Sequence, residues 1–291
     1  MAYEGFRPEV LARELMTDRG RDCVFKNLTY KGPIIGEITK KGDVLHIAGV
    51  GRPTVRDYAP GSDITLEQKS SYNQDLYITQ AKYVNVEVDR LDKAQAQGEV
   101  FGVEVKEAKK ALAQTLDEYL AGFYDQAGET IANDSCTAET ILSTLAEAEQ
   151  KLLEAEVPFE EEKFLVISPA IYTKLVLGKI MFQQNNADVF GKGFKGSFLN
   201  FNVYVSNSIK KKEENGKITH HCMAFSRQSI ALAEQIPASM IERYSPEKTF
   251  ADAFKVLHLY GATVIRPGEL VCVDLTPGTE SAGTESAGTE A

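Results

Sequence analysis

Residues 105–127 read Val105-Lys-Glu-Ala-Lys-Lys-Ala-Leu-Ala-Gln-Thr-Leu-Asp-Glu-Tyr-Leu-Ala-Gly-Phe-Tyr-Asp-Gln-Ala127, and this stretch decides how the chain folds. Apolar side chains recur in it every three to four positions, the period of an α-helix with one buried face. A helix of this length is a rod of roughly 35 Å, at 1.5 Å per residue. We expect a spine helix over residues 103–132, with the rest of the chain built against it.

Downstream of the spine, residues 134–236 alternate helix and strand signals. Thr137 opens a helical pattern that Val157-Pro158 closes, and Phe164–Ile167 is a short apolar run typical of a buried strand. Ser168-Pro169 follows this strand and suits the first turn of another helix. The order of these signals predicts an inserted α/β domain.

Upstream of the spine, residues 39–88 have the signals of a long β-hairpin. In the run Leu76–Asp89, apolar and polar side chains alternate, as they do in a strand with one buried face. Few large apolar side chains lie near the tip of this hairpin, so it cannot form a core of its own. It lies either across another part of the chain or against a neighbouring subunit.

The two ends of the chain differ in character. Residues 1–38 have too few apolar side chains for an independent core and are predicted to be an arm that lies on something else. Residues 237–275 return to long strands, so we expect them to complete one domain together with residues 89–133. Residues 276–291 repeat Gly, Thr, Glu, Ser and Ala with no larger apolar side chain, which predicts a disordered tail.

The composition is that of a globular protein and excludes several classes. The 291 residues are 43% hydrophobic and 25% charged, which excludes a disordered chain, a collagen and a coiled-coil rod. A formal net charge of -10 argues against a protein that grips nucleic acid by its phosphates. Four widely spaced cysteines indicate reduced thiols in the cytoplasm. No apolar run is long enough to span a bilayer, and we expect neither a secretion signal nor a membrane partner.

The sequence motifs that could indicate metal binding, dinucleotide binding or catalysis are weak. In a strand, His220 and Cys222 share one face while His221 points to the other, and two ligands are too few for zinc. Gly191-x-Gly193-x-x-Gly196 matches a dinucleotide fingerprint in letters, but it precedes a strand instead of following one, which favours a flexible loop. No nucleophile motif is present. We therefore predict no catalytic residue, no metal site and no cofactor.

Taken in order, these features and several short strings resemble the major capsid proteins of tailed bacteriophages with the Hong Kong 97 type fold, an α+β fold. The resemblance covers about residues 1–275, all but the tail. The strings that carry it are Gly49-Val-Gly-Arg-Pro-Thr-Val-Arg-Asp-Tyr58, Gly61-Ser-Asp-Ile-Thr65, Phe164-Leu-Val-Ile-Ser-Pro169, Phe201-Asn-Val-Tyr-Val-Ser-Asn207 and Tyr260-Gly-Ala-Thr-Val-Ile-Arg-Pro267.

The resemblance implies a structural subunit made in the bacterial cytoplasm and incorporated into a virion. It assigns residues 1–38 to an N-terminal arm and 39–88 to an extended loop. Residues 89–133 with 237–275 would form a peripheral domain, and 134–236 an axial domain. Its implied partners are further copies of itself in pentamers and hexamers, a scaffolding protein, a portal and non-specific packaged double-stranded DNA. Candidate assembly contacts are Arg52, Arg56, Asp57, Asp63, Phe194 and Phe198.

Two other functions remain open from the sequence. The first is an encapsulin-like bacterial compartment, which the same fold also serves. The second is a metabolic enzyme that uses the α/β region 134–236. The enzyme would be a compact monomer or small oligomer with its hairpin packed on its own body, whereas both shell proteins would form rings or closed particles.

Overall fold

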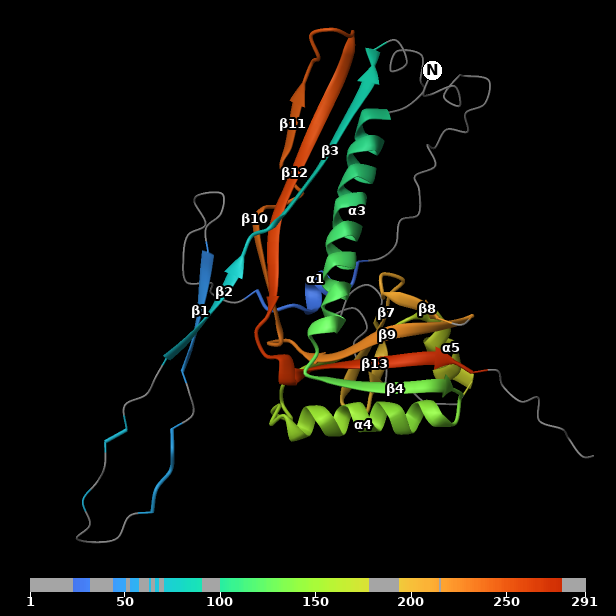
Figure 1. The fold of residues 1–291 in the computed structure, drawn as a ribbon. Coiled ribbons are helices and arrows are strands. Elements are labelled where there is room, and N and C mark those ends of the chain that lie inside the picture. The colour runs from blue at the N-terminus through green and yellow to red at the C-terminus, as the bar shows by residue number, and fades with distance from the viewer. Residues whose placement is uncertain are drawn as a thin grey trace, which may run out of the picture. The chain divides into compact units, whose positions relative to one another are not determined.

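The computed structural model describes residues 23–31, 44–50, 53–57, 63, 66–67, 71–90, 100–177, 194–214 and 216–278. The chain divides into two compact units. The first draws its described residues from Tyr30–Leu112 and Ile230–Ile265, and the second from Asp18–Thr29, Ala113–Ser229 and Arg266–Ala291. Helix α3 (Val100–Leu120) begins in the first unit and ends in the second (Figure 1). Helices and sheets together make an α+β fold, as expected.

The first unit is mainly antiparallel β-structure. Its strands are β1 (Val44–Val50), β2 (Ser71–Tyr77), β3 (Gln80–Asp89), β10 (Ile230–Ile236), β11 (Ile241–Tyr244) and β12 (Ala251–Val264). β12 is the centre of a four-stranded sheet, with β3 along one edge and β10 and β11 pairing with successive parts of the other. β1 and β2 pair with each other and form the base of the extended hairpin.

The core of this sheet is made with the first turns of α3. Val88 from β3 and Phe254 from β12 are fully buried, and Phe101 and Leu112 from the helix are buried against them. The rings of Phe101 and Phe254 meet edge to face, with their centroids 5.3 Å apart. The 3-to-4 spacing seen in the sequence thus places the helix on the sheet, as amphipathic packing requires.

The base of the hairpin packs on its own subunit. Leu45 and Leu76 from β1 and β2 join Ala231, Ala233 and Leu259 in a second buried cluster. Gly261 allows this close approach, because a Cβ atom at that position would overlap the backbone carbonyl oxygen of Tyr77. The predicted long strand Leu76–Asp89 is divided into β2 and β3 by a break at residues 78–79, next to this close approach.

The second unit is a seven-stranded mixed sheet covered by helices. Six strands follow the order β4-β13-β9-β5-β7-β6, and β8 adds to β9. The bounds are α1 (Phe25–Leu28), the 3-10 helix η2 (Ala121–Gln126), β4 (Glu129–Cys136), α4 (Thr140–Glu154), β5 (Lys163–Ile167), α5 (Pro169–Leu177), β6 (Phe194–Phe198), β7 (Phe201–Val205), β8 (Lys211–Glu214), β9 (Lys217–Ser226), the 3-10 helix η3 (Pro267–Glu269) and β13 (Leu270–Pro277).

Helix α4 lies along β4 and β13 and buries the periodic face that the sequence predicted. Ile141, Leu145, Ala148 and Leu152 are fully buried there. All five residues of β5 are buried, including Lys163, and burial of both faces of the strand explains the apolar run Phe164–Ile167.

The short helix α1 is held on this unit by one buried carboxylate. The Oδ1 atom of Asp117, a residue of α3, accepts hydrogen bonds from the backbone N–H groups of Val24 at 2.9 Å and Phe25 at 2.7 Å. Phe25 also stacks on Phe225, with ring centroids 6.3 Å apart. Burial is the largest influence on Asp117 and raises the pKa of its carboxyl group.

Two sequence-based element boundaries are wrong. The spine helix was expected over 103–132, but α3 ends at Leu120 and β4 occupies 129–136 as a parallel partner of β13. Gly128 donates hydrogen bonds to the carbonyl oxygens of Pro267 and Leu270, which fixes the change of direction. β13 runs to Pro277, so the described start of the predicted tail is a strand. Most of that tail, residues 279–291, and most of the arm, residues 1–22, lie outside the described residues.

Candidate assembly surfaces

The tip of the extended hairpin is exposed at every described position, namely 53–57, 63, 66 and 67. Val55 and Leu66 are each 93% exposed. The carboxylate of Glu67 accepts hydrogen bonds from the backbone N–H of Thr54 at 3.0 Å and from its hydroxyl at 3.1 Å, which ties the two limbs together. The described tip of the hairpin is therefore a loop with two fully exposed apolar side chains.

The predicted contact residues fall on two separate surfaces. Arg56, Asp57 and Asp63 are exposed on the hairpin tip in the first unit, and Arg52 lies outside the described residues. Phe194 and Phe198 belong to β6 in the second unit. Phe198 is half-buried, and the side chain of Phe194 lies outside the description. Their part in assembly remains a prediction.

The glycine-punctuated loop predicted at 191–196 is a strand from Phe194 onward. β6 pairs antiparallel with β7, and its register shifts between Phe194 and Gly196. Gly196 has a φ of 133°, which suits a bulge at that shift and explains why the glycine pattern suggested a loop. β6 is the terminal strand of the described sheet, opposite β4.

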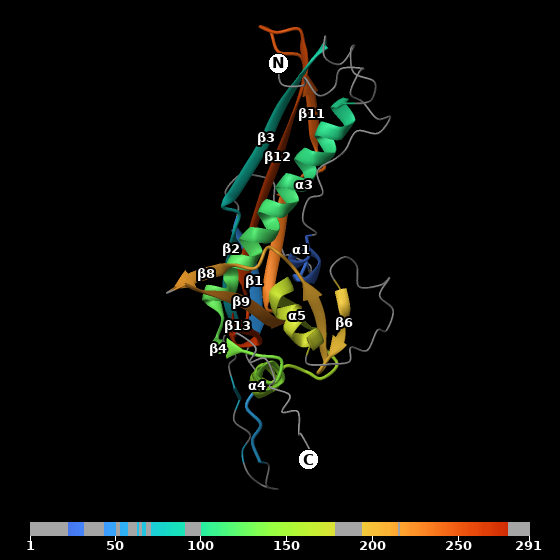
Figure 2. The same ribbon diagram turned by 90° about the vertical axis from the view of Figure 1, so that its right-hand side faces the viewer.

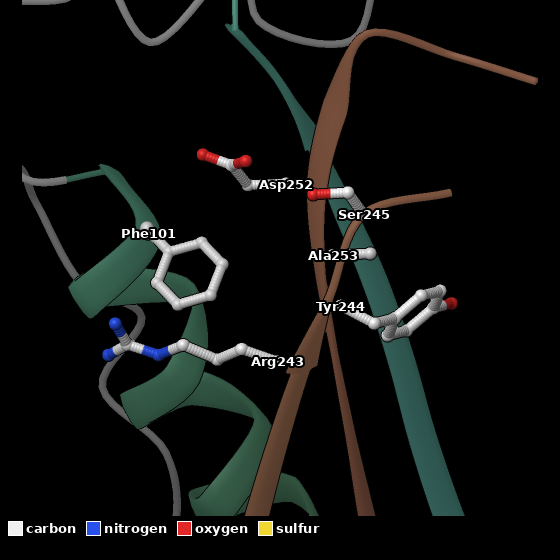
Figure 3. Close-up of a pocket in the computed structure, with 6 residues that line it drawn as sticks. All are labelled: Phe101, Arg243, Tyr244, Ser245, Asp252 and Ala253. Atoms are coloured by element: carbon white, nitrogen blue, oxygen red, sulfur yellow. The ribbon is translucent and has the colours of Figure 1, made fainter. Parts of the chain in front are cut away.

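A cavity of about 310 Å³ lies in the first unit between α3, β11 and β12 (Figure 3). The guanidinium of Arg243 lies 4.8 Å from the ring centroid of Phe101. Arg90 forms an ion pair with Asp252 at 3.0 Å and donates a hydrogen bond to the Ser245 hydroxyl at 3.1 Å. The carboxylate of Asp252 and the hydroxyl of Ser245, which both line the cavity, are therefore already bonded to Arg90. No histidine or cysteine is among the described side chains that line this cavity.

A polar cluster in the second unit joins residues that the sequence did not connect. His221 on β9 and Asp274 on β13 approach to 2.6 Å between Nδ1 and Oδ1, and the thiol of Cys272 donates to the same Oδ1 atom at 3.1 Å. Tyr124 stacks on the His221 ring with centroids 4.2 Å apart. The pKa of Cys272 is raised mainly because the thiol is buried, and further by its hydrogen bond to the negatively charged Asp274. These are side chains that can ligate a metal, and in the structure they clamp two neighbouring strands.

The predicted pair His220 and Cys222 does not take part in this cluster, because neighbouring strand residues point to opposite faces. The partners of His221 come from a strand some fifty residues later, which local spacing does not reveal. None of the helices in the described part of the chain is both long and apolar enough to cross a bilayer.

Comparison with solved structures identifies related folds. A structure from Mycobacterium phage Che8 matches with a TM-score of 0.71 and 26% sequence identity, covering 93% of this chain and 98% of that one. The capsid structure of the cyanophage P-SCSP1u matches with a TM-score of 0.70 and 16% identity, covering 93% and 92% of the two chains. The capsid of Ralstonia phage GP4 matches with a TM-score of 0.69 and 13% identity, covering 93% of this chain and 95% of that one.

A more distant match is the SrpI encapsulin complex from Synechococcus elongatus PCC 7942, with a TM-score of 0.55 and 13% identity over 73% of this chain and 81% of that one. No protein-family model and no curated protein matches the sequence.

Proposed function

We propose that this chain, which has the Hong Kong 97 type fold of tailed-phage capsid proteins, is a major capsid protein. It assembles with copies of itself into the pentamers and hexamers of an icosahedral shell that encloses double-stranded DNA. The observation that carries this proposal is the match along almost the whole of both chains to the Che8 structure, at 26% identity. The exposed hairpin tip supports it independently.

Assembly follows from cooperative burial. Val55 and Leu66 are apolar, exposed and held on a loop whose base is fixed in its own subunit. A neighbouring copy that covers them removes apolar area from water, a gain of roughly 25 cal/mol per Å². Each contact is modest, but closed symmetry repeats it in every subunit of the shell.

The parts of the chain take the roles that the family resemblance implies. Residues 1–38 act as an arm and 39–88 as the extended loop. Residues 89–133 with 237–275 form the peripheral domain, and 134–236 form the axial domain. Arg56, Asp57 and Asp63 lie on the loop tip and Phe198 on the edge strand β6. Each is proposed to make a contact between copies.

The function is structural, without catalysis. The cavity beside Phe101 holds a satisfied Arg90–Asp252 pair, and the cluster at Asp274 is a clamp between strands. A scaffolding protein and a portal are the further protein partners. The net charge of -10 suits the wall of a shell, because a negatively charged wall does not bind the packaged DNA non-specifically and so does not hinder its packing and ejection.

An encapsulin-like compartment is the second candidate, favoured by the match to the SrpI complex. That match has a lower TM-score and covers less of this chain than the phage structures do. The contents of the particles separate the two functions. A capsid protein gives particles that hold nuclease-protected DNA, whereas a compartment protein gives particles that hold a packaged protein.

The assembly itself is tested by mass photometry and negative-stain electron microscopy of the purified chain over a series of concentrations. The proposal predicts species of five and six times the subunit mass and closed shells above a threshold concentration. A chain that remains a monomer at every concentration, with no rings in the images, would overturn it.

A further inference from the structure

An aromatic side chain is exposed to solvent at one end of the first unit. Phe250 is 85% exposed, more than any other Phe or Tyr in the described part of the chain. It is the last residue of the loop between β11 and β12, and its carbonyl oxygen accepts a hydrogen bond from the backbone N–H of Arg90 at 3.0 Å. The backbone at position 250 is therefore anchored, while the ring remains in water.

The cavity beside Phe101 lies at the same end of this unit. Figure 2 shows the first turn of α3 and the loop between β11 and β12 at that end. Asp252, two residues after Phe250, is part of the cavity wall. The ring of Phe250 does not lie inside this cavity, because almost all of its surface is exposed. A ring and a cavity thus lie close together on one copy, and the ring does not fill the cavity.

The chemistry of the cavity suits an aromatic ring. In Figure 3 the guanidinium of Arg243 lies beside the ring of Phe101, with 4.8 Å between its central carbon atom and the ring centroid. A planar guanidinium has two faces that can stack on aromatic rings, so a second ring can bind on the face away from Phe101. Asp252 and Ser245 are bonded to Arg90, so an apolar ring enters without breaking a hydrogen bond of the wall.

The cavity is also large enough for a phenylalanine side chain. Its volume is about 310 Å³. An engineered apolar cavity of about 150 Å³ already binds benzene. A single exposed apolar side chain is ordinary on a protein surface. An exposed ring beside a cavity that matches it in size and chemistry indicates a contact between copies.

We propose that Phe250 of one copy docks in the cavity between Phe101 and Arg243 of a neighbouring copy. This inference rests on the proposed capsid function and names a contact of the first unit other than that of the hairpin tip. In the contact the Phe250 ring stacks on the guanidinium of Arg243, which then lies between two aromatic rings.

The occupant is a second copy of this chain because the ring and the cavity lie at the same end of the same unit. Each copy gives one ring and receives one. Copies that meet at this end around a symmetry axis therefore fill every cavity and bury every ring, and the group closes without a surplus contact.

The first test locates the contact by photocrosslinking in assembled particles. The full chain carries p-benzoylphenylalanine in place of Phe250 and is assembled with an equal amount of wild-type chain labelled with a heavy nitrogen isotope. Mass spectrometry then separates links between copies from links within one copy. We expect position 250 to link to residues 100–106 and 241–245 of a different copy.

The matched control carries the same amino acid in place of Phe159, which is 79% exposed in the second unit. It should not label residues 100–106 or 241–245. The inference is overturned if position 250 gives no link between copies, links only to other segments, or labels these segments no more than the probe at position 159 does.

The second test measures the strength of the contact through Phe250→Ala. Because Phe250 is exposed in the single copy, this variant should have the urea unfolding curve of the wild type. We expect the threshold concentration for shells to rise about thirtyfold, the loss typical of truncating a central aromatic residue of an interface. Phe250→Tyr keeps the ring and should assemble close to the wild-type threshold. An Ala variant that assembles like the wild type, or a Tyr variant as weak as the Ala variant, contradicts the contact.

The wild type separates the two possible failures. If it forms shells and the tests on position 250 fail, this inference is overturned and the capsid function stands. If it forms neither rings nor shells at any concentration, the capsid function itself fails.

Discussion

The anchor of helix α1 gives a prediction whose size can be worked from the structure. Asp117 is fully buried and accepts hydrogen bonds from the backbone N–H groups of Val24 and Phe25, which are also buried. Asp117→Ala leaves both donors without an acceptor, at about 1–3 kcal/mol each. Because removing the carboxylate also removes its desolvation cost, we expect a loss of about 2–4 kcal/mol in the free energy of unfolding.

The matched variant is Asp117→Asn, which keeps a carbonyl oxygen where Oδ1 lies. We expect it to lose less than about 1 kcal/mol, since both N–H groups keep their acceptor. Urea unfolding at pH 7 gives the two free energies, and hydrogen exchange of the Val24 and Phe25 amides reports the anchor directly. The reasoning is refuted if the Ala and Asn variants are equally destabilised, or if those amides exchange no faster in the Ala variant.

Three further predictions follow from buried groups. Burial raises the pKa of Asp117 above its ordinary 3.8, so its ionised form costs stability at neutral pH. Lowering the pH from 7 to 4 should therefore stabilise the wild type relative to Asp117→Asn in urea unfolding, and an unchanged difference would contradict this. Gly261→Ala should cost about 2–3 kcal/mol because its Cβ overlaps backbone, while Gly122→Ala, with nothing within 4 Å, should cost nothing; equal melting temperatures would refute the close approach. At pH 8 only the half-buried Cys23 should react quickly with a thiol reagent, because burial raises the pKa of the other three thiols, to about 11 in Cys136 and about 12 in Cys222; a second fast thiol in the folded protein would disprove it.

Local periodicity predicted the main elements well. The elements predicted in this way are the spine helix, the buried strand Phe164–Ile167, the helix with Ile141 on its inner face and the long closing strand β12. In each of them the apolar residues recur with a period that gives one buried face in only one type of secondary structure. The α+β class and the likeness to phage capsid proteins followed from their order, and the comparisons confirm both.

Long-range contacts determined what the sequence did not reveal. Residues 129–136 form a strand and do not continue the helix, because they pair in parallel with β13, more than a hundred residues later in the sequence. The anchor between Asp117 and α1 spans 93 positions, and the cluster at Asp274 joins strands some fifty positions apart. Spacing within one segment carries no signal for such pairs.

The assembly surfaces were predicted in part. The sequence marked the hairpin as lacking a core, and the structure refines this, because the base packs on its own subunit while the described tip is exposed.

The central claim is that the extended hairpin is completed by a neighbouring copy. A cryo-electron microscopy reconstruction of assembled particles tests it most directly, through the surroundings of Val55 and Leu66. We predict icosahedral shells in which both side chains are buried against an adjacent subunit. Shells in which the hairpin tip remains in solvent, or folds back on its own subunit, would contradict the account.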